Sequence, residues 1–126
     1  MDRCPCGSGD AYDDCCGRYH RGDAAAPTAE ALMRSRYSAF AVGDAAYLLS
    51  SWHPRTRPAT LELDDDVTWR HLDVVRTEHG SPWDTAGTVE FTAHFASPAG
   101  RGRLHEVSRF VREGGRWFYV DGVTSD

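Results

Sequence analysis

The sequence lacks four residue types and any long apolar run. Its 126 residues include no lysine, asparagine, glutamine or isoleucine, so all 14 basic residues are arginine. No stretch approaches the roughly 20 apolar residues that a helix needs to cross a membrane. Residues 1–4 contain no apolar segment of the kind found in an export signal. These absences exclude a membrane partner from our expectations and favour a cytoplasmic location.

Positive charge is also scarce. The 14 basic residues are outnumbered by 19 acidic ones, which gives a net charge of −5 and an isoelectric point near 5.6. A broad surface for nucleic acid or anionic lipid needs an excess of positive charge, so we expect neither partner. Hydrophobic residues make up 40% of the chain, which excludes a disordered protein and suits one domain with a small appendage.

Cysteine is confined to one short segment. Cys4 and Cys6 are separated by one residue, and after eight more residues Cys15 and Cys16 stand side by side. Four thiolates within tetrahedral reach form a soft site that suits zinc. The segment has few apolar side chains, so a bound metal would supply the folding free energy that a core supplies elsewhere. The spacing therefore predicts a structural zinc site.

Other roles for these cysteines remain open at this point. Neighbouring Cys15 and Cys16 could form a disulfide only through a strained ring, and cross-pairs would need an oxidising compartment. A redox pair normally has a C-x-x-C spacing, which differs from the spacing here. His20 could replace one cysteine as a ligand. Four sulfur ligands would close the metal shell, which favours a structural ion over a catalytic one.

The hydrophobic pattern divides the chain near residue 23. Residues 1–23 hold all the cysteines, whereas residues 24–126 carry every Trp, Phe, Leu and Val. A segment without large apolar side chains cannot form a core of its own. We therefore expect a zinc-binding motif over residues 1–23 and a folded domain over residues 24–126.

Two helices are predicted at the start of the second part. Apolar residues recur at spacings of three and four after Thr28, which suits the N-cap of an amphipathic helix. Gly43 would end this helix, because glycine tolerates positive φ. Asp44 is expected to cap a second helix, which would carry Trp52 and end at His53-Pro54.

From about residue 68 the hydrophobic period changes to two. Val89, Phe91 and Ala93 alternate with polar residues, and turns rich in Gly and Pro separate four such segments. Consecutive strands joined by short turns indicate an antiparallel meander. Because the helices precede the strands, the pattern predicts an α+β fold in which a helix pair packs on a curved antiparallel sheet.

The cysteine segment resembles a known zinc-binding module, the SEC-C motif. The run Cys-Pro-Cys-Gly-Ser-Gly over residues 4–9, then Tyr12, then Cys-Cys-Gly over residues 15–17 matches that motif closely. The resemblance implies that the zinc ligands are Cys4, Cys6, Cys15 and Cys16. Many such modules carry lysines between the cysteine pairs, whereas this chain has three aspartates there, at positions 10, 13 and 14.

The rest of the chain resembles the bacterial YchJ family. The resemblance rests on residues 31–40, 51–54, 105–110 and 115–122, with runs such as His-Glu-Val-Ser-Arg-Phe. It implies a SEC-C module followed by a cone-shaped domain similar to nuclear transport factor 2 (NTF2-like). This implication agrees with the order of helices and strands predicted from the hydrophobic pattern.

Polar residues could line a pocket inside such a domain. Strand alternation predicts that Tyr119 and Asp121 share one face of the last strand and that Glu106 lies on one face of the preceding strand. If both faces look inward, these residues would form a small polar patch inside an aromatic pocket. Ordinary structural roles suit the same residues, such as a helix end, a turn or an ion pair with a neighbouring arginine. The candidates for a pocket are His53, Glu106, Tyr119 and Asp121.

Two functions follow from these features. The first is an adaptor whose zinc-stabilised motif binds a protein partner, because a closed four-thiolate shell stands beside no nucleophile or cofactor loop. The alternative is a small hydrolase, isomerase or lyase that uses a polar pocket in the cone-shaped domain. The sequence assigns no catalytic residue, and an adaptor is the favoured hypothesis.

Overall fold

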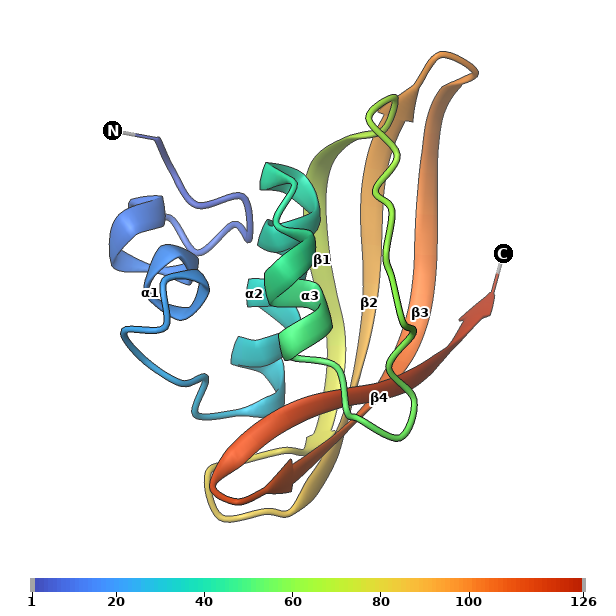
Figure 1. Ribbon diagram of the computed structural model, residues 1–126. Helices are drawn as coiled ribbons and strands as arrows, with labels where there is room; N and C mark the ends of the chain where they lie inside the picture. Colours follow the sequence, from blue (N-terminus) through green and yellow to red (C-terminus); the bar gives the residue numbers. More distant parts are fainter. Residues whose placement is uncertain (1, 126) are drawn as a thin grey trace.

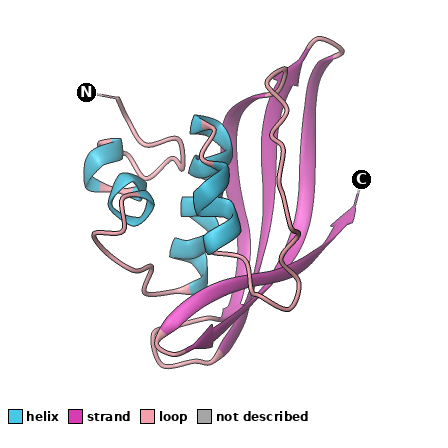
Figure 2. Ribbon diagram, in the orientation of Figure 1, coloured by secondary structure: helices cyan, strands magenta, loops and turns pink. Residues whose placement is uncertain are grey.

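The cysteine-rich segment, the helices and the sheet form three successive layers. The structure is a computed structural model that describes residues 2–125. Figure 1 shows the N-terminal segment on the outer side of the helices and the sheet on their other side. Figure 2 shows the same separation by secondary structure, with all strands in one layer. The α+β class predicted from the sequence is confirmed.

Two helices follow the predicted caps closely. Helix α2 spans Ala29–Val42, the Oγ1 of Thr28 accepts a hydrogen bond from the backbone N–H of Ala31, and Gly43 ends the helix with φ of 82°. Helix α3 spans Ala45–Ser50, and the carboxylate of Asp44 caps it. The capping side chains satisfy backbone N–H groups that have no partner inside the helix.

The predicted extension of the second helix to Trp52 is wrong. Helix α3 ends at Ser50, and the next three residues run alongside the last strand, β4 (Arg116–Ser125). The backbone N–H of Tyr119 donates to the Ser51 carbonyl, and that of His53 donates to the Tyr119 carbonyl. The N–H groups of Ser51 and Trp52 still bond back to the last turn of α3, but the N–H of His53 bonds to the distant strand instead of continuing the helix.

The sheet is the antiparallel meander predicted from the period of two. Its strands follow chain order, and each pairs with the next. The connecting turns lie at the Gly- and Pro-rich segments. The remaining strands are β1 (Thr68–His79), β2 (Ala86–Ser97) and β3 (Gly100–Glu113).

A β-bulge interrupts the last strand pair. Arg109 pairs with Asp121, but the next residue, Phe110, pairs with Tyr119, so Val120 is an extra residue in β4. A bulge reverses the alternation of side chains that follow it. Tyr119 therefore faces the helices, as buried Phe110 does, while Asp121 faces the opposite side of the sheet.

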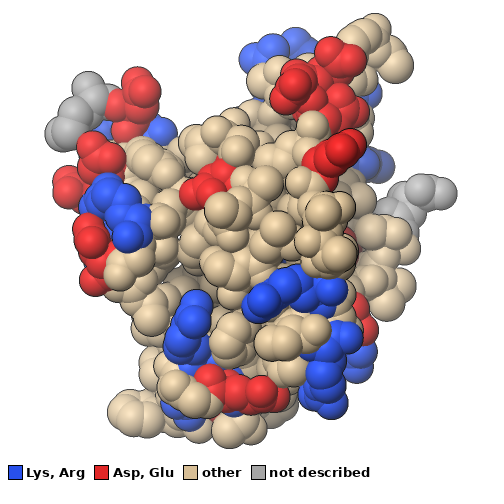
Figure 3. All heavy atoms as spheres, in the orientation of Figure 1, with Lys and Arg blue, Asp and Glu red and all other residues tan. Residues whose placement is uncertain are grey.

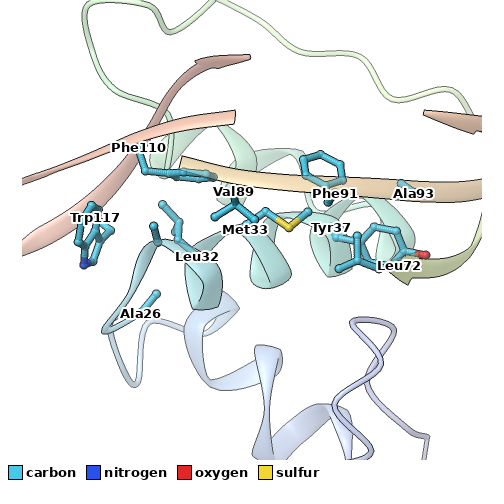
Figure 4. Packing of buried hydrophobic residues seen from close by; sticks show 11 residues of the cluster. Ala26, Leu32, Met33, Tyr37, Leu72, Val89, Phe91, Ala93, Phe110 and Trp117 are labelled. Atoms are coloured by element: carbon cyan, nitrogen blue, oxygen red, sulfur yellow. The ribbon is translucent and has the colours of Figure 1, made fainter. Parts of the chain in front are cut away.

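The main core lies between α2 and the inner face of the sheet. Leu32, Met33 and Tyr37 of α2 pack against side chains from all four strands, as Figure 4 shows. Burial of these apolar side chains supplies most of the stabilisation of the helix–sheet layers. The strand residues of the core are Leu72, Val89, Phe91, Ala93, Phe110 and Trp117. The helices formed within residues 2–125 are all too short or too polar to span a lipid bilayer.

Candidate metal centre and interior cavity

A tight backbone loop places the first two cysteines. The N–H of Cys4 donates to the carbonyl of Asp10 over 2.8 Å, which closes the loop that holds Cys6. Gly7 and Gly9 have φ of 83° and 90°, a region that other residues adopt at a cost. The glycines of the motif therefore permit the turn that brings the Cys4 and Cys6 side chains together.

Two short helical turns position the second cysteine pair, Cys15 and Cys16. Residues Tyr12–Asp14 form a 3₁₀ turn, η1, and helix α1 spans Cys16–His20. The chain changes direction at Cys15, between the two turns. A Cβ at Gly17 would lie only 2.7 Å from the carbonyl oxygen of Tyr12, so the residue after the cysteine pair has no room for a side chain. Close packing of η1 on α1 thus explains the glycine.

The four sulfur atoms form one compact cluster. All lie within 4.8 Å of one another, and the Cys6 and Cys15 sulfurs are 3.7 Å apart. Tetrahedral zinc with Zn–S bonds near 2.3 Å requires sulfur–sulfur distances of about 3.8 Å. A disulfide would require about 2.05 Å, and all four thiols are free. The cluster is therefore arranged to hold a metal ion.

Burial and hydrogen bonding couple the thiols of the cluster. Cys4 is 4% exposed and Cys16 is 1% exposed. The hydrogen bond with Cys16 lowers the pKa of Cys4, and the same contact raises the pKa of Cys16. A divalent cation bound between the sulfurs would favour the thiolate form of all four cysteines.

Helix α2 supports the cluster from beneath through two side chains. The Nη1 of Arg34 donates to the carbonyl of Cys6 over 2.8 Å, and its Nε pairs with Glu30. The hydroxyl of Ser38 lies 3.4 Å from the sulfur of Cys4. Neither residue was predicted from the sequence as part of the site. Their spacing of four places them on one face of a helix, and that spacing is the feature that could have identified them.

His20 has a different role from the ligand role considered above. Its Nε2 donates to the carbonyl of Ser35 over 2.8 Å, and its Nδ1 accepts a hydrogen bond from the Tyr12 hydroxyl. Both ring nitrogens are therefore engaged. Within residues 2–125 the metal-binding group consists of the four cysteines, and His20 instead connects α1 to α2.

The four candidate pocket residues do not meet at one site. Glu106 and Tyr119 line a cavity of about 210 Å³ between α2 and the sheet. Asp121 lies on the other face of the sheet because of the bulge, and its carboxylate accepts hydrogen bonds from the Arg109 guanidinium. The alternation used to group Asp121 with Tyr119 is therefore broken in the structure.

His53 lines the same surface hollow as Asp121, and it does not line the cavity that contains Glu106. Both line an open surface hollow of about 710 Å³. The Nδ1 of His53 accepts a hydrogen bond from the Arg55 backbone, so its Nε2 carries the proton and donates to Glu113 over 3.1 Å. This buried imidazole fixes the chain after α3 to the end of β3.

The carboxylate of Glu106 is held inside the cavity by hydroxyl groups. Its Oε2 accepts hydrogen bonds from Ser108 and, over 3.4 Å, from Tyr119. Burial and the negative charge of Glu106 raise the pKa of Tyr119 to about 12, so its hydroxyl is protonated and acts as the donor at neutral pH. No ion pair between Glu106 and an arginine forms among the described residues.

Comparison with known proteins yields two family matches. Residues 28–122 match the model of the YchJ middle NTF2-like domain, and residues 2–18 match the SEC-C motif. A UPF0225 protein of Streptomyces coelicolor is 57% identical over 123 residues, covering 98% of this chain and 96% of that protein. A UPF0225 protein of Chromobacterium violaceum is 54% identical over 126 residues, covering 97% and 93%.

Two solved structures share the fold. The solution structure of a SEC-C motif containing protein from Rhodopseudomonas palustris is 34% identical with a TM-score of 0.84, covering 100% of both chains. The crystal structure of a SEC-C motif containing protein from Psychrobacter arcticus is 30% identical with a TM-score of 0.78, covering 98% of this chain and 82% of that one. The chain therefore belongs to the YchJ family and combines an N-terminal SEC-C motif with an NTF2-like domain.

Proposed function

We propose that the chain is a zinc-binding adaptor. In this proposal one zinc ion stabilises residues 2–23, which we call the cysteine knuckle, and the exposed side of the knuckle binds a protein partner. The observation that carries the proposal is the cluster of four free thiols, which would complete a tetrahedral shell around zinc without a solvent-derived ligand. The ligands would be Cys4, Cys6, Cys15 and Cys16.

Zinc is the ion that this donor set favours. Thiolate sulfur binds soft or borderline metals, and four sulfurs in a tetrahedral arrangement suit zinc better than calcium or magnesium, which take oxygen ligands. The ion would hold the loop around Cys6 against α1 and supply no reactive position. Its chemistry in the knuckle is therefore structural.

The charge of the knuckle indicates the kind of partner. Residues 1–23 contain three arginines and five aspartates, a formal charge of −2, and four thiolates with one Zn²⁺ would add −2 more. Asp10 and Asp14 are exposed and form no ion pair among the described residues. Figure 3 shows acidic side chains along the outer edge of the N-terminal layer. A partner with basic side chains would complement this surface, whereas nucleic acid or an anionic membrane would be repelled.

Metal analysis tests the first half of the proposal. Purified protein should contain one zinc ion per chain by atomic emission spectroscopy, and Cys15→Ser should reduce this to well below one. Ser8→Ala is the matched control, because the Ser8 hydroxyl lies 3.1 Å from the Cys15 sulfur but is not a proposed ligand. Absence of metal from the unmodified protein, or unchanged zinc in Cys15→Ser, would reject the zinc site.

Charge reversal tests the second half. Asp10→Arg with Asp14→Arg should abolish capture of the partner in quantitative affinity purification while zinc content stays at one. Asp65→Arg with Asp66→Arg changes the net charge equally on an exposed loop away from the knuckle, and should capture the same protein as the unmodified chain. Equal losses from both pairs, or from neither, would show that the knuckle surface does not select the partner.

A further inference from the structure

The cavity between α2 and the sheet contains a buried cation with unused donors. Arg36 is 6% exposed and lines this cavity. Its Nη1 donates to the carbonyl of Leu48 over 2.8 Å and to the hydroxyl of Ser51 over 2.7 Å. Among the residues that the structure describes, its Nε and Nη2 make no hydrogen bond. These N–H groups are therefore free to donate to an acceptor in the cavity.

Aromatic rings hold the Arg36 guanidinium in a fixed position. Its central carbon lies 4.3 Å from the centre of the Tyr119 ring and 5.1 Å from that of Trp52. The rings stabilise the cation through their faces. Burial lowers the pKa of Arg36 to about 10, so the side chain remains charged at neutral pH. The unused donors are therefore both charged and preorganised.

Trp52, which lines the same cavity, also has a donor without a partner in the described part of the chain. The indole N–H of Trp52 is buried and has no hydrogen-bond partner among residues 2–125. An unsatisfied buried donor costs about 1–3 kcal/mol, so a ligand acceptor that reached it would recover part of this cost. Two residues that line one cavity thus have N–H groups without hydrogen-bond partners among the residues described.

Glu106 provides a hydrogen-bond acceptor in the same cavity. Both hydrogen bonds to its carboxylate reach Oε2, and no described residue donates to Oε1. A Cβ at Gly122 would overlap this carboxylate, so the glycine after the bulge makes the room in which Glu106 lies. The cavity therefore offers an acceptor as well as donors.

Size and charge limit the ligand further. A volume of about 210 Å³ corresponds to about seven water molecules, enough for one small ring compound. Tyr37, Trp69 and Phe91 supply flat apolar walls. A ligand anion would be repelled by Glu106, and a ligand cation by Arg36, so an uncharged molecule fits best.

We propose that this cavity binds a small neutral aromatic amide or lactam. Its carbonyl oxygen would accept hydrogen bonds from Arg36 and Trp52, its N–H would donate to Glu106, and its ring would lie between the aromatic walls. This binding site is separate from the cysteine cluster and does not depend on the adaptor function.

Four probes with the same ring test this chemistry on the full-length protein. Benzamide is neutral with a carbonyl and an N–H, benzoate is an anion, benzamidine is a cation, and toluene has neither donor nor acceptor. Quenching of tryptophan fluorescence reports binding, since Trp52 and Trp69 line the cavity. Benzamide should saturate with a Kd at least about tenfold below each of the others. Failure of benzamide to bind, or equal affinity for toluene, would overturn the proposal.

Variants that preserve the fold locate the contacts. Trp52→Phe keeps the ring but removes the N–H, so it should weaken benzamide about tenfold without changing toluene binding. Glu106→Gln should move the benzamide-to-benzoate affinity ratio about tenfold towards benzoate. Glu90→Gln is the matched control, because Glu90 pairs with His105 outside the cavity. An unchanged ratio in Glu106→Gln, or the same shift in Glu90→Gln, would contradict the assignment.

Discussion

The cysteine knuckle and the helix–sheet body, which comprises residues 24–125, are held together by different forces. The buried apolar cluster of the knuckle consists of three cysteines, with Tyr12 and Cys15 packed at its side. The body buries a cluster of eleven hydrophobic residues that joins α2 to all four strands. Apolar burial of this extent stabilises a domain by itself, whereas three thiols do not. The knuckle is therefore the part that we expect to depend on a bound metal, whereas the body has an apolar core of its own.

The contact between the two regions combines apolar packing with polar bonds. Tyr19 of the knuckle packs against the core of the body, and the His20 ring lies 4.6 Å from the Tyr47 ring. The contact also includes the hydrogen bonds of Arg34 to Cys6 and of His20 to Ser35, together with the contact between Ser38 and Cys4. Polar contacts depend on direction, so they orient the knuckle on α2 as long as its loops keep their shape. We expect the metal to maintain that shape.

Metal removal should produce the largest difference between the regions. Chelation should remove amide hydrogen-exchange protection from residues 4–20 while β2 and β3 stay protected, because zinc binding supplies roughly 10–16 kcal/mol in small zinc modules. Hydrogen exchange followed by mass spectrometry measures this directly. Added zinc should restore protection, which serves as the control. Equal protection of the knuckle with and without metal would show that it is stable unaided.

Truncation of a core side chain should destabilise the body without affecting metal binding by the knuckle. Phe110 is 1% exposed at the centre of the body, so Phe110→Ala should lower the free energy of unfolding by about 3–5 kcal/mol. Zinc content should remain one per chain wherever the variant is folded. Val123→Ala, at a residue 73% exposed, should change stability by less than about 0.5 kcal/mol. Loss of zinc from folded Phe110→Ala would mean that the two regions form one cooperative unit.

Local chemistry explains why much of this arrangement was predictable. Thr28 and Gly43 mark the ends of α2 because capping and positive φ depend on the residue itself. The period of two revealed the strands because one face of the sheet is buried. The cysteine spacing predicted a cluster for a similar reason, since loop and ligands lie in one short segment.

Interactions between distant residues explain what was not predictable. The bulge at Val120 depends on how β4 pairs with β3, and it turns Asp121 away from the cavity. Trp52 leaves the helical pattern because its neighbours bond to β4, and Arg34 reaches Cys6 across 28 positions of sequence. Arg36 lies on the buried side of α2, where a charged side chain is not expected.

The polar contact between the regions should have an intermediate effect. Arg34→Leu removes a charged donor from the Cys6 carbonyl, so zinc affinity in competition with a chelator should fall about tenfold while the body keeps its stability. Arg70→Leu is the control, since Arg70 is exposed on β1. Unchanged affinity in Arg34→Leu would mean that the knuckle holds its metal without help from α2.

The smallest expected effect concerns a buried hydroxyl of the body at high pH. Because the folded-state pKa of Tyr119 is raised to about 12, the unfolded chain ionises first, near 10. The contribution of Tyr119 to stability is therefore complete below pH 10 and is lost as pH rises towards 12. Arg36, whose pKa is lowered to about 10, contributes the opposite slope over part of the same range.

Tyr119→Phe isolates the tyrosine contribution. Denaturant unfolding between pH 9 and pH 12 should show stability falling less steeply than in the unmodified protein, by at most about 1.4 kcal/mol per pH unit. Trp83→Phe, at a residue 87% exposed, removes no titratable group and should leave the slope unchanged. A slope identical in Tyr119→Phe and the unmodified protein would mean that the Tyr119 hydroxyl reaches water in the folded state. The walls of the cavity would then be less closed than its aromatic lining indicates.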